Sequence, residues 1–413
     1  MPGAAGVSTV LEIPGIPEAL PPLLLELARE QRAALVGGAV RDLLLHRVHN
    51  DPWRGLPDLD LVVEGRAGDF VARLERALPA GSVRGALEHG AYGTVELELA
   101  INGTPVLLDV ASARRETYPV PGENPRVTLG ALADDLARRD FSINAMALDL
   151  ASGRLLDPHG GQADLQHRRL RWLHATSVAD DPTRLVRGAR YAARLGFELD
   201  PASREQVVAT LAAWPWAWRA GDPPGQAPAA LGTRLRMELE LLLKREPWRP
   251  ALVALQRWGG LVLLDPALQA DQRWQQRLWW AARFAVPLLP ALVAGAGDPL
   301  ALAERLQLPH RQHRLLAQAL ALRQRLVEAP PPRDAAAWCE LLEAPGLSVE
   351  AITLALVDGA GPRRPLLRWL LRWRRLKAPL SAAELIAAGW RPGPELGAEL
   401  RRLRSQRLAE ERC

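Results

Sequence analysis

The sequence has 413 residues, of which 48% are hydrophobic and 24% charged, a composition typical of a soluble globular protein with two to four domains. No apolar run is long enough to span a membrane, because the best one, at 284–293, contains two prolines, and the start of the chain lacks a secretory signal. Two cysteines, Cys339 and Cys413, exclude a disulfide framework and a thiolate metal site, so we expect a cytoplasmic protein.

The net charge of +5 is concentrated near the end of the chain. Residues 361–413 contain thirteen Arg or Lys and five Glu. Such a basic segment favours a polyanionic partner, RNA or DNA rather than a membrane, with a solvated helix face as the alternative.

The hydrophobic pattern predicts an α/β region from residue 31 to about 150. Its predicted elements in chain order are a strand at 33–36, a helix beginning at 40–45, a buried strand at 59–63, a helix at 70–78, and two strands at 94–100 and 106–110 joined by an Asn102-Gly103 turn. The segment 113–126, "ARRETYPVPGENPR", contains three prolines and a glycine, and we expect a mobile loop.

After about residue 150 the strand signals fade, and helical periodicity predicts an all-α remainder. The Pro- and Gly-rich stretch 219–231 predicts a linker or surface insertion, and "APPP" at 329–332 predicts another boundary. The tryptophans in "WPWAWR" and "RWQQRLWW" are interpreted as core or groove-filling residues rather than as a base-stacking platform.

The stretch "LVGGAVRDLLL" at 35–45 places Gly37 and Gly38 between an apolar strand and a helix. A glycine turn at a helix N-terminus exposes backbone N–H groups, which can bind phosphate. Arg41 follows one helical turn later, where its guanidinium could bind phosphate oxygens. Taken alone, the stretch is better explained as a tight turn into a helix.

In "DLDLVV", Asp58 and Asp60 are two residues apart, so on a strand both carboxylates point to the same face. Their repulsion is costly unless a cation neutralises it, and Mg²⁺ prefers oxygen ligands. Asp109, within an apolar strand, is the preferred third carboxylate, and Glu96 and Glu98 are alternatives. Three converging carboxylates could bind two metal ions for in-line attack on phosphorus.

Two further motifs follow. "ARRDFSINAMALDL" places Arg138, Arg139 and Asp140 before an apolar segment, with Asn144 four residues after Asp140. In "ADDPTRLVRGARYAARLGF", Asp181 precedes Pro182 and is suited to cap a helix.

The helix that Asp181 would cap carries a basic face. It is formed by arginines at every third position, which are Arg184, Arg187 and Arg190. No acidic residues alternate with them in the sequence. Asp181 and Arg184 together offer acceptors and donors to the edge of a base, with Arg187 and Arg190 nearer to phosphate.

These motifs, in this order and near these spacings, resemble those of the class II tRNA nucleotidyltransferase and bacterial poly(A) polymerase family. The resemblance covers residues 35–197, with a weaker match in "LSAAELIAAGWRPGPELGAELRRLR" near the end. It implies an α+β nucleotidyltransferase head with a small mixed β-sheet, followed by an all-α neck, body and tail. The implied boundaries are 1–30 for an N-terminal extension, 31–172 for the head, 173–245 for the neck, 246–330 for the body and 331–413 for the basic tail.

The resemblance also implies roles for individual residues. Asp58 and Asp60 would bind Mg²⁺ and act in catalysis with Asp109, whose surrounding motif is weaker. Three groups of residues would bind the nucleotide. They are the glycine turn (Gly37 and Gly38), the base-selecting pair (Asp181 and Arg184) and four further arginines (Arg41, Arg139, Arg187 and Arg190). The tail would bind tRNA through Arg372, Arg374, Arg375 and Arg391. This chain has Asp180 where the family usually has Glu, which could alter the switch between bases.

The expected activity is addition of C and A residues to the tRNA 3′ end from CTP and ATP, without a template and with release of pyrophosphate. The sequence leaves open whether the product is CCA, CC or A alone, and it says nothing of the oligomeric state. A poly(A) polymerase acting on varied RNA 3′ ends is the nearest alternative, and a non-catalytic RNA-binding protein is a second one.

Overall fold

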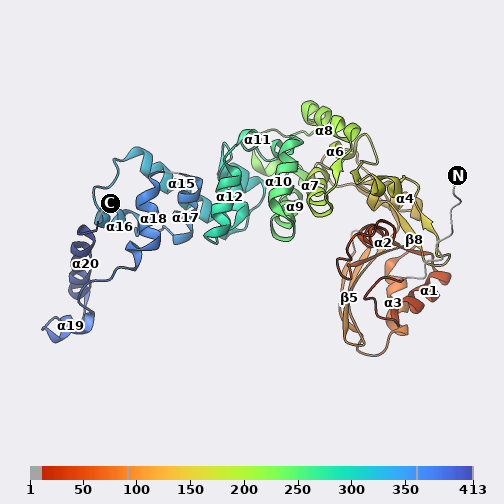
Figure 1. Cartoon of the computed structure of the whole chain (residues 1–413), viewed down its shortest axis with the longest axis horizontal. Coiled ribbons are helices and arrows are strands. Elements are labelled where there is room, and N and C mark those ends of the chain that lie inside the picture. Colours follow the sequence, from red (N-terminus) through yellow and green to blue (C-terminus); the bar gives the residue numbers. More distant parts are fainter. Residues whose placement is uncertain (1–11, 91–92, 360, 412–413) are drawn as a thin grey trace. The chain divides into compact units, whose positions relative to one another are not determined.

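The computed structural model describes residues 12–90, 93–359 and 361–411 (Figure 1). The chain forms two compact units. The first contains residues 1–217, 228–230 and 246–259, and the second contains 218–227, 231–245 and 260–413. Among the described helices, none combines the length and the apolar character needed to cross a membrane.

A seven-stranded mixed sheet is the framework of the first unit, with the strand order β3-β4-β5-β2-β1-β8-β9. Neighbouring strands are antiparallel except for β2 and β5, which are parallel. The strands are β1 (Ala33–Val36), β2 (Leu59–Val63), β3 (Val83–His89), β4 (Thr94–Ile101), β5 (Thr104–Ser112), β8 (Ala147–Asp149) and β9 (Leu155–Leu156). The sheet confirms the predicted mixed α+β head.

Most of the predicted elements in this sheet are confirmed. The strands at 33–36 and 59–63 have the predicted bounds, and β4 and β5 extend the two predicted hairpin strands by a few residues. Asn102 and Gly103 both have positive φ, as a tight two-residue hairpin turn requires. Strand β3 was not predicted, because its largely exposed residues give no clear alternation of buried and solvent-facing positions.

One face of the sheet is covered by helix α3 (Ala67–Ala77), which contacts β2, β4 and β5 and itself packs on α1 (Leu20–Glu30). Phe70, Val71 and Leu74 of α3 are buried. On the opposite face, Val62 packs with Leu132 and Leu136 of α4 (Leu132–Ala137). Because side chains alternate along each strand, Asp60 of β2 and Asp109 of β5 lie on the face that α3 does not cover.

The segment 113–126, expected to be a loop, has strand structure at its start. Strand β6 (Arg114–Thr117) pairs antiparallel with β7 (Arg126–Leu129). The expectation of a loop is therefore wrong for residues 114–117 and for Arg126. The three prolines occupy the connection between the two strands, where they cost no ladder hydrogen bond.

Downstream of the head, the described part of the chain consists of helices joined by loops. Its strand structure is limited to the two-residue strand β11 (Glu198–Leu199), which pairs with β10 (Arg169–Leu170), and an isolated bridge between Ala220 and Asp222. The remaining helices of the first unit are α2 (Gly37–His49), η1 (Ser142–Asn144), α5 (Gly161–Gln166), α6 (Ser177–Asp180), α7 (Thr183–Leu195), α8 (Pro201–Ala213) and α10 (Trp248–Arg257). Helices α7 and α10 pack together.

The second unit is built from helices. They are η2 (Pro224–Gln226), α9 (Thr233–Arg245), η4 (Gly260–Leu263), α11 (Pro266–Ala270), α12 (Trp274–Arg283), α13 (Leu288–Val293), α14 (Pro299–Arg305), α15 (His310–Glu328), α16 (Ala335–Leu342), α17 (Val349–Asp358), α18 (Arg363–Leu371), η5 (Trp373–Arg375), α19 (Ala382–Ala387) and α20 (Pro394–Ala409). The short helix η3 (Ala229–Leu231) lies where the chain passes between the units, inside the predicted linker at 219–231.

The tryptophans of "WPWAWR" and "RWQQRLWW" differ in burial. Trp216, Trp218 and Trp274 are buried, as the core-filling interpretation predicts. Trp279 and Trp280 of α12 are exposed and contact each other, so this pair does not fill the core, and Trp214 is half-buried.

Candidate active site

An acidic row crosses three adjacent strands of the sheet. Asp60 of β2 is the register partner of Asp109 in the parallel strand β5, and Asp109 is the register partner of Glu96 in β4. Asp58 is exposed and immediately precedes β2, two residues before Asp60. The structure therefore brings Asp60 beside Asp109, with Glu96 one strand farther away.

The like charges and partial burial of this row perturb its titration. Burial, together with the carboxylates of Asp60, Glu96 and Asp58, raises the pKa of Asp109 to about 6. Burial also raises the pKa of Asp60, against the opposing effect of the Arg139 guanidinium. A cation placed between these carboxylates would relieve the repulsion, because it stabilises both ionised forms.

The first glycine of the "GG" turn lies next to this row. Gly37 has φ of +66°, a left-handed conformation that favours glycine. A methyl group on Gly37 would lie 3.2 Å from Asp60 Oδ2 and 3.2 Å from Arg139 Nη1. Gly38 has an ordinary φ, and a methyl group there would meet Arg41 Nη2 at 3.5 Å, which is normal contact.

Arg139 is held in place by Asp135 of α4. Asp135 is buried and accepts from Arg139 Nη2 at 2.8 Å and from Arg138 Nε at 2.9 Å. These two arginines hold the pKa of Asp135 below its usual value despite burial. The spacing of three and four residues along a helix is the sequence signal that could have identified this acid.

Arg41 is more buried than the prediction of a phosphate-binding side chain implies. It is 2% exposed, and its guanidinium donates to Asp42 Oδ1 at 2.8 Å and to Asn144 Oδ1 at 2.9 Å. Its guanidinium also lies 5.4 Å from the centre of the Tyr191 ring. Contact between Arg41 and a triphosphate stays a prediction.

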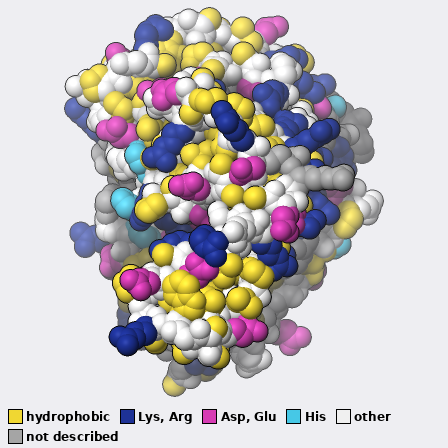
Figure 2. Space-filling model, turned by 90° about the vertical axis from the view of Figure 1, so that its left-hand side faces the viewer, with side chains coloured by type: hydrophobic (Ala, Val, Ile, Leu, Met, Phe, Trp, Pro, Cys, Tyr) yellow, Lys and Arg dark blue, Asp and Glu magenta, His cyan; other side chains and the backbone are white. Residues whose placement is uncertain are grey.

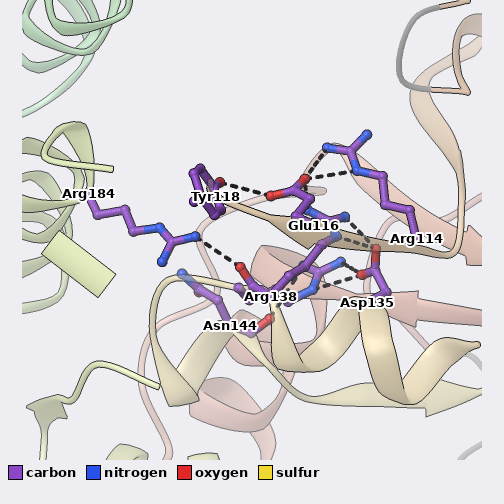
Figure 3. Close-up of polar contacts among 8 residues, drawn as sticks. Arg114, Glu116, Tyr118, Asp135, Arg138, Asn144 and Arg184 are labelled. Carbon is purple, nitrogen blue, oxygen red and sulfur yellow. Dashed lines mark hydrogen bonds and ion pairs between the residues drawn. The ribbon is translucent and has the colours of Figure 1, made fainter. Parts of the chain in front are cut away.

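A second polar network connects the β6 strand to Arg184 (Figure 3). Glu116 accepts from Arg114 at 2.8 Å, from Arg138 at 3.1 Å and from the Tyr118 hydroxyl at 3.0 Å. Its side chain is only 7% exposed. Burial and the Glu116 carboxylate raise the pKa of Tyr118, which keeps its hydroxyl protonated as a donor.

Arg184 is fixed by the same network. Its guanidinium donates to the backbone oxygen of Arg138 at 3.1 Å and lies 5.8 Å from the centre of the Tyr118 ring. Glu116 and Tyr118 were not singled out from the sequence. Their alternation with Arg114 at every second position, typical of a strand face, was the available signal.

Asp181 lies just before α7, and its carboxylate accepts from the backbone N–H of Thr183 at 3.1 Å and from the Thr183 hydroxyl at 2.6 Å. It thus has the predicted capping contacts, and its proposed role in base selection stays a prediction. Asp180 accepts from the Thr176 hydroxyl at 2.7 Å.

The arginines of α7 have acidic partners that are distant in sequence. Arg187 Nε donates to Asp140 at 2.9 Å, and Arg190 pairs with Glu246 at 3.4 Å. Both acids lie outside α7, so the lack of acidic residues alternating with the arginines did not exclude ion pairs on this face. Asp140 is buried and the Arg187 guanidinium contributes to holding its pKa below the usual value, which opposes the effect of burial.

The predicted RNA-binding arginines lie in the second unit and are exposed. Arg372 pairs with Glu411 at 2.8 Å, and Arg374 Nε donates to the backbone oxygen of Leu370 at 2.8 Å. On the face viewed in Figure 2, basic side chains are interspersed with acidic and hydrophobic ones rather than forming one continuous patch. The charge pattern on this face therefore does not by itself define an RNA site.

Comparison with known proteins agrees with this geometry. Residues 33–171 match the family described as the poly A polymerase head domain. A CC-adding tRNA nucleotidyltransferase of Deinococcus radiodurans is 40% identical over 298 residues, 70% of each chain. An A-adding tRNA nucleotidyltransferase of Halalkalibacterium halodurans is 41% identical over 181 residues, 43% of this chain and 39% of that one.

Solved structures extend the similarity to the helical part. The Thermotoga maritima CCA-adding enzyme complexed with tRNA aligns with a TM-score of 0.66 and 25% identity, covering 99% of this chain and 95% of that one. The fold and the acidic site thus define a nucleotidyltransferase. The chain belongs to the tRNA nucleotidyltransferase and poly(A) polymerase family.

Proposed function

We propose that this chain extends the 3′ end of tRNA with nucleotides from CTP or ATP and releases pyrophosphate. The observation that carries the proposal is the pairing of Asp60 with Asp109 in parallel strands, beside the left-handed turn at Gly37 and the guanidinium of Arg139. Carboxylates for metal and donors for phosphate are the groups that nucleotidyl transfer requires.

The donor set fits Mg²⁺ bound together with a nucleotide. In the described ranges, no three His, Cys, Asp or Glu side chains form a metal-holding cluster on their own. Mg²⁺ bound with substrate phosphates needs only one or two protein carboxylates, because phosphates and water complete its octahedron. Asp58 and Asp60 would hold it, with Asp109 as the third carboxylate.

In the proposed reaction the terminal ribose hydroxyl of tRNA attacks the α-phosphorus of the nucleotide, and pyrophosphate leaves. Bound Mg²⁺ would lower the pKa of the attacking hydroxyl and neutralise phosphate charge. The N–H groups of the Gly37-Gly38 turn and Arg139 would hold the triphosphate. Asp181 and Arg184 would contact the base, with Arg187 and Arg190 supporting the nucleotide.

Addition of CC is the variant that the comparisons favour. The match with the CC-adding enzyme of Deinococcus radiodurans, 40% identical over 298 residues, is longer and closer than the match with the A-adding enzyme of the same organism, 33% identical over 250 residues. The test supplies tRNAs that lack CCA, end at the first C or end at the second C, with CTP and ATP separately and with Mg²⁺ or EDTA.

Each outcome of that test selects one activity. Extension of the first two substrates by CTP alone supports CC addition. Extension of the third by ATP supports A addition, and both together support CCA addition. Long A-tracts on unrelated RNA would indicate a poly(A) polymerase, and no metal-dependent extension of any RNA would exclude an enzymatic role.

A further inference from the structure

Five side chains of the first unit form a closed ring of contacts. Arg41 Nη1 donates to Asn144 Oδ1 at 2.9 Å, and Asn144 Nδ2 donates to Asp140 Oδ1 at 3.1 Å. Asp140 Oδ2 accepts from Arg187 Nε at 2.9 Å, and Arg187 Nη2 lies 3.4 Å from the Tyr191 hydroxyl. The Tyr191 ring faces Arg41 again, 5.4 Å from its guanidinium carbon.

The ring joins three elements that carry different parts of the candidate site. Arg41 belongs to α2, whose first residues are the glycine turn. Asn144 belongs to η1, and Arg187 belongs to α7, which follows Asp181 and contains Arg184. The backbone oxygen of Asn144 also accepts from Arg139 Nη1 at 3.4 Å.

Asparagine is the residue type that this central position requires. Its amide accepts from the cationic Arg41 through oxygen and donates to the anionic Asp140 through nitrogen. An aspartate could not donate when ionised, and an aliphatic residue could do neither. Arg41, Asp140 and Asn144 are each at most 5% exposed, so water cannot readily replace a missing contact.

We propose that Asn144 is a positioning residue that couples the triphosphate seat at the start of α2 to the base-selecting helix α7. The inference rests on the proposed function for the identity of the nucleotide. Through Asn144, the position of Arg41 depends on the Asp140–Arg187 ion pair, so the affinity for phosphate and the orientation of α7 change together. Asn144 contacts neither base nor phosphate in this arrangement.

The test is a double-mutant cycle read out by the binding of inorganic tripolyphosphate with Mg²⁺, a probe that has no base. Calorimetry on the full chain compares wild type, Asn144→Ala, Arg187→Gln and the double variant. We expect Asn144→Ala to weaken binding about tenfold, the effect of losing one charge-assisted hydrogen bond. Arg187→Gln should weaken binding in the wild-type background and have no further effect in the Asn144→Ala background.

Two further variants separate positioning from folding. Asn144→Asp retains the acceptor for Arg41 and removes the donor to Asp140, so it should abolish the coupling to Arg187. Gln31→Ala is the matched control, because Gln31 is also an amide that links two segments, donating to the backbone oxygens of Glu64 and Arg66 away from this ring. It should leave tripolyphosphate binding unchanged.

Independent, multiplicative effects of Asn144→Ala and Arg187→Gln would overturn the proposal, as would equal binding by wild type and Asn144→Ala. In tRNA extension, Asn144→Ala should raise the KM for nucleotide more than it lowers kcat, whereas a loss of folded protein lowers kcat alone. Failure of wild type to extend tRNA would instead remove the proposed function, while the tripolyphosphate cycle would still measure the coupling.

Discussion

Asp60 and Asp109 lie opposite each other in the two parallel strands of an otherwise antiparallel sheet, although they are far apart in sequence. The pairing places two carboxylates side by side on the sheet face that α3 leaves uncovered. The pKa of each carboxyl is raised above its usual value, and the Asp60 carboxylate contributes to the rise at Asp109. The ionised, unliganded site is therefore electrostatically unfavourable. Such stored repulsion is typical of a site that binds a cation.

Replacing Asp60 by Asn should abolish nucleotide incorporation without unfolding the protein. Loss of a metal ligand removes several kcal/mol of transition-state stabilisation, which corresponds to a rate decrease of at least about 100-fold. Because one repelling charge is removed, the melting temperature without Mg²⁺ should equal or exceed that of wild type. Asp69→Asn, at an exposed position of α3, is the control. Near-normal incorporation by Asp60→Asn would contradict the metal assignment.

The stability of the metal-free protein should depend on pH through Asp109. Its folded-state pKa of about 6 lies above the ordinary value of 3.8 for an aspartate, so between these values the native state binds more protons than the unfolded state. The free energy of unfolding should therefore fall as pH rises from about 4 to about 6, by about 1 kcal/mol after allowance for solvent screening. Chemical denaturation of wild type and Asp109→Asn across this range measures the difference, which should vanish in the variant.

Binding of Mg²⁺ should show the matching dependence. Because a metal ligand must be deprotonated, the affinity for Mg²⁺ should be lower at pH 5 than at pH 7.5. Titration of Mg²⁺ with nucleotide present checks this by calorimetry. A pH-independent affinity would exclude Asp109 from the metal site.

The two glycines of the turn should respond differently to alanine. Gly37→Ala forces a side chain into a left-handed conformation and close to Asp60 and Arg139, so it should lower the free energy of unfolding by at least about 1 kcal/mol. Gly38→Ala meets no obstacle and removes a glycine from a helix, so stability should be equal or up to about 1 kcal/mol higher. A raised KM for nucleotide in stable Gly38→Ala would indicate close phosphate approach there. An unchanged KM would argue against it.

Glu116 should be a stability determinant of the β6 strand. Glu116→Gln removes the buried carboxylate, only 7% exposed, with which Arg114 and Arg138 pair. Because both guanidinium groups lose their ion pair with Glu116, we expect the free energy of unfolding to fall by about 2 kcal/mol. Tyr118→Phe removes one hydrogen bond and should cost about 1 kcal/mol. Denaturant unfolding measures both, with Glu88→Gln, an exposed residue of β3, as control. Equal stability of Glu116→Gln and Glu88→Gln would contradict this role.

Binding of tRNA should depend on the tail arginines through charge. Replacing Arg375 and Arg391 by Gln should reduce the slope of log affinity against log salt by about 2, with the KM for nucleotide unchanged. Filter binding over a range of salt concentrations checks this. Arg311→Gln, an exposed residue of α15 that pairs with Glu350, is the comparison outside the tail. Identical slopes for wild type and the tail variant would remove these two residues from the interface.

Local patterns in the sequence were sufficient for much of the head. Strands β1 and β2, the Asn102-Gly103 turn and the helix after Gly38 follow from contacts between residues close in the chain, which alternation and turn chemistry encode. The position of Asp60 on a strand is equally local, whereas Asp58 precedes β2, so its placement on the same face as Asp60 stays a prediction. The cap at Asp181 is equally local.

Tertiary structure decided which side chains of the site contact each other. The parallel register that sets Asp109 beside Asp60, the ion pair of Arg187 with Asp140 and the burial of Arg41 against Asn144 all join residues remote in sequence. No periodicity encodes which strand pairs with which, or which acid meets which arginine, because those choices minimise the free energy of the whole packed unit. The sequence alone thus determined the kinds of groups at the site, and only packing determined which of them touch.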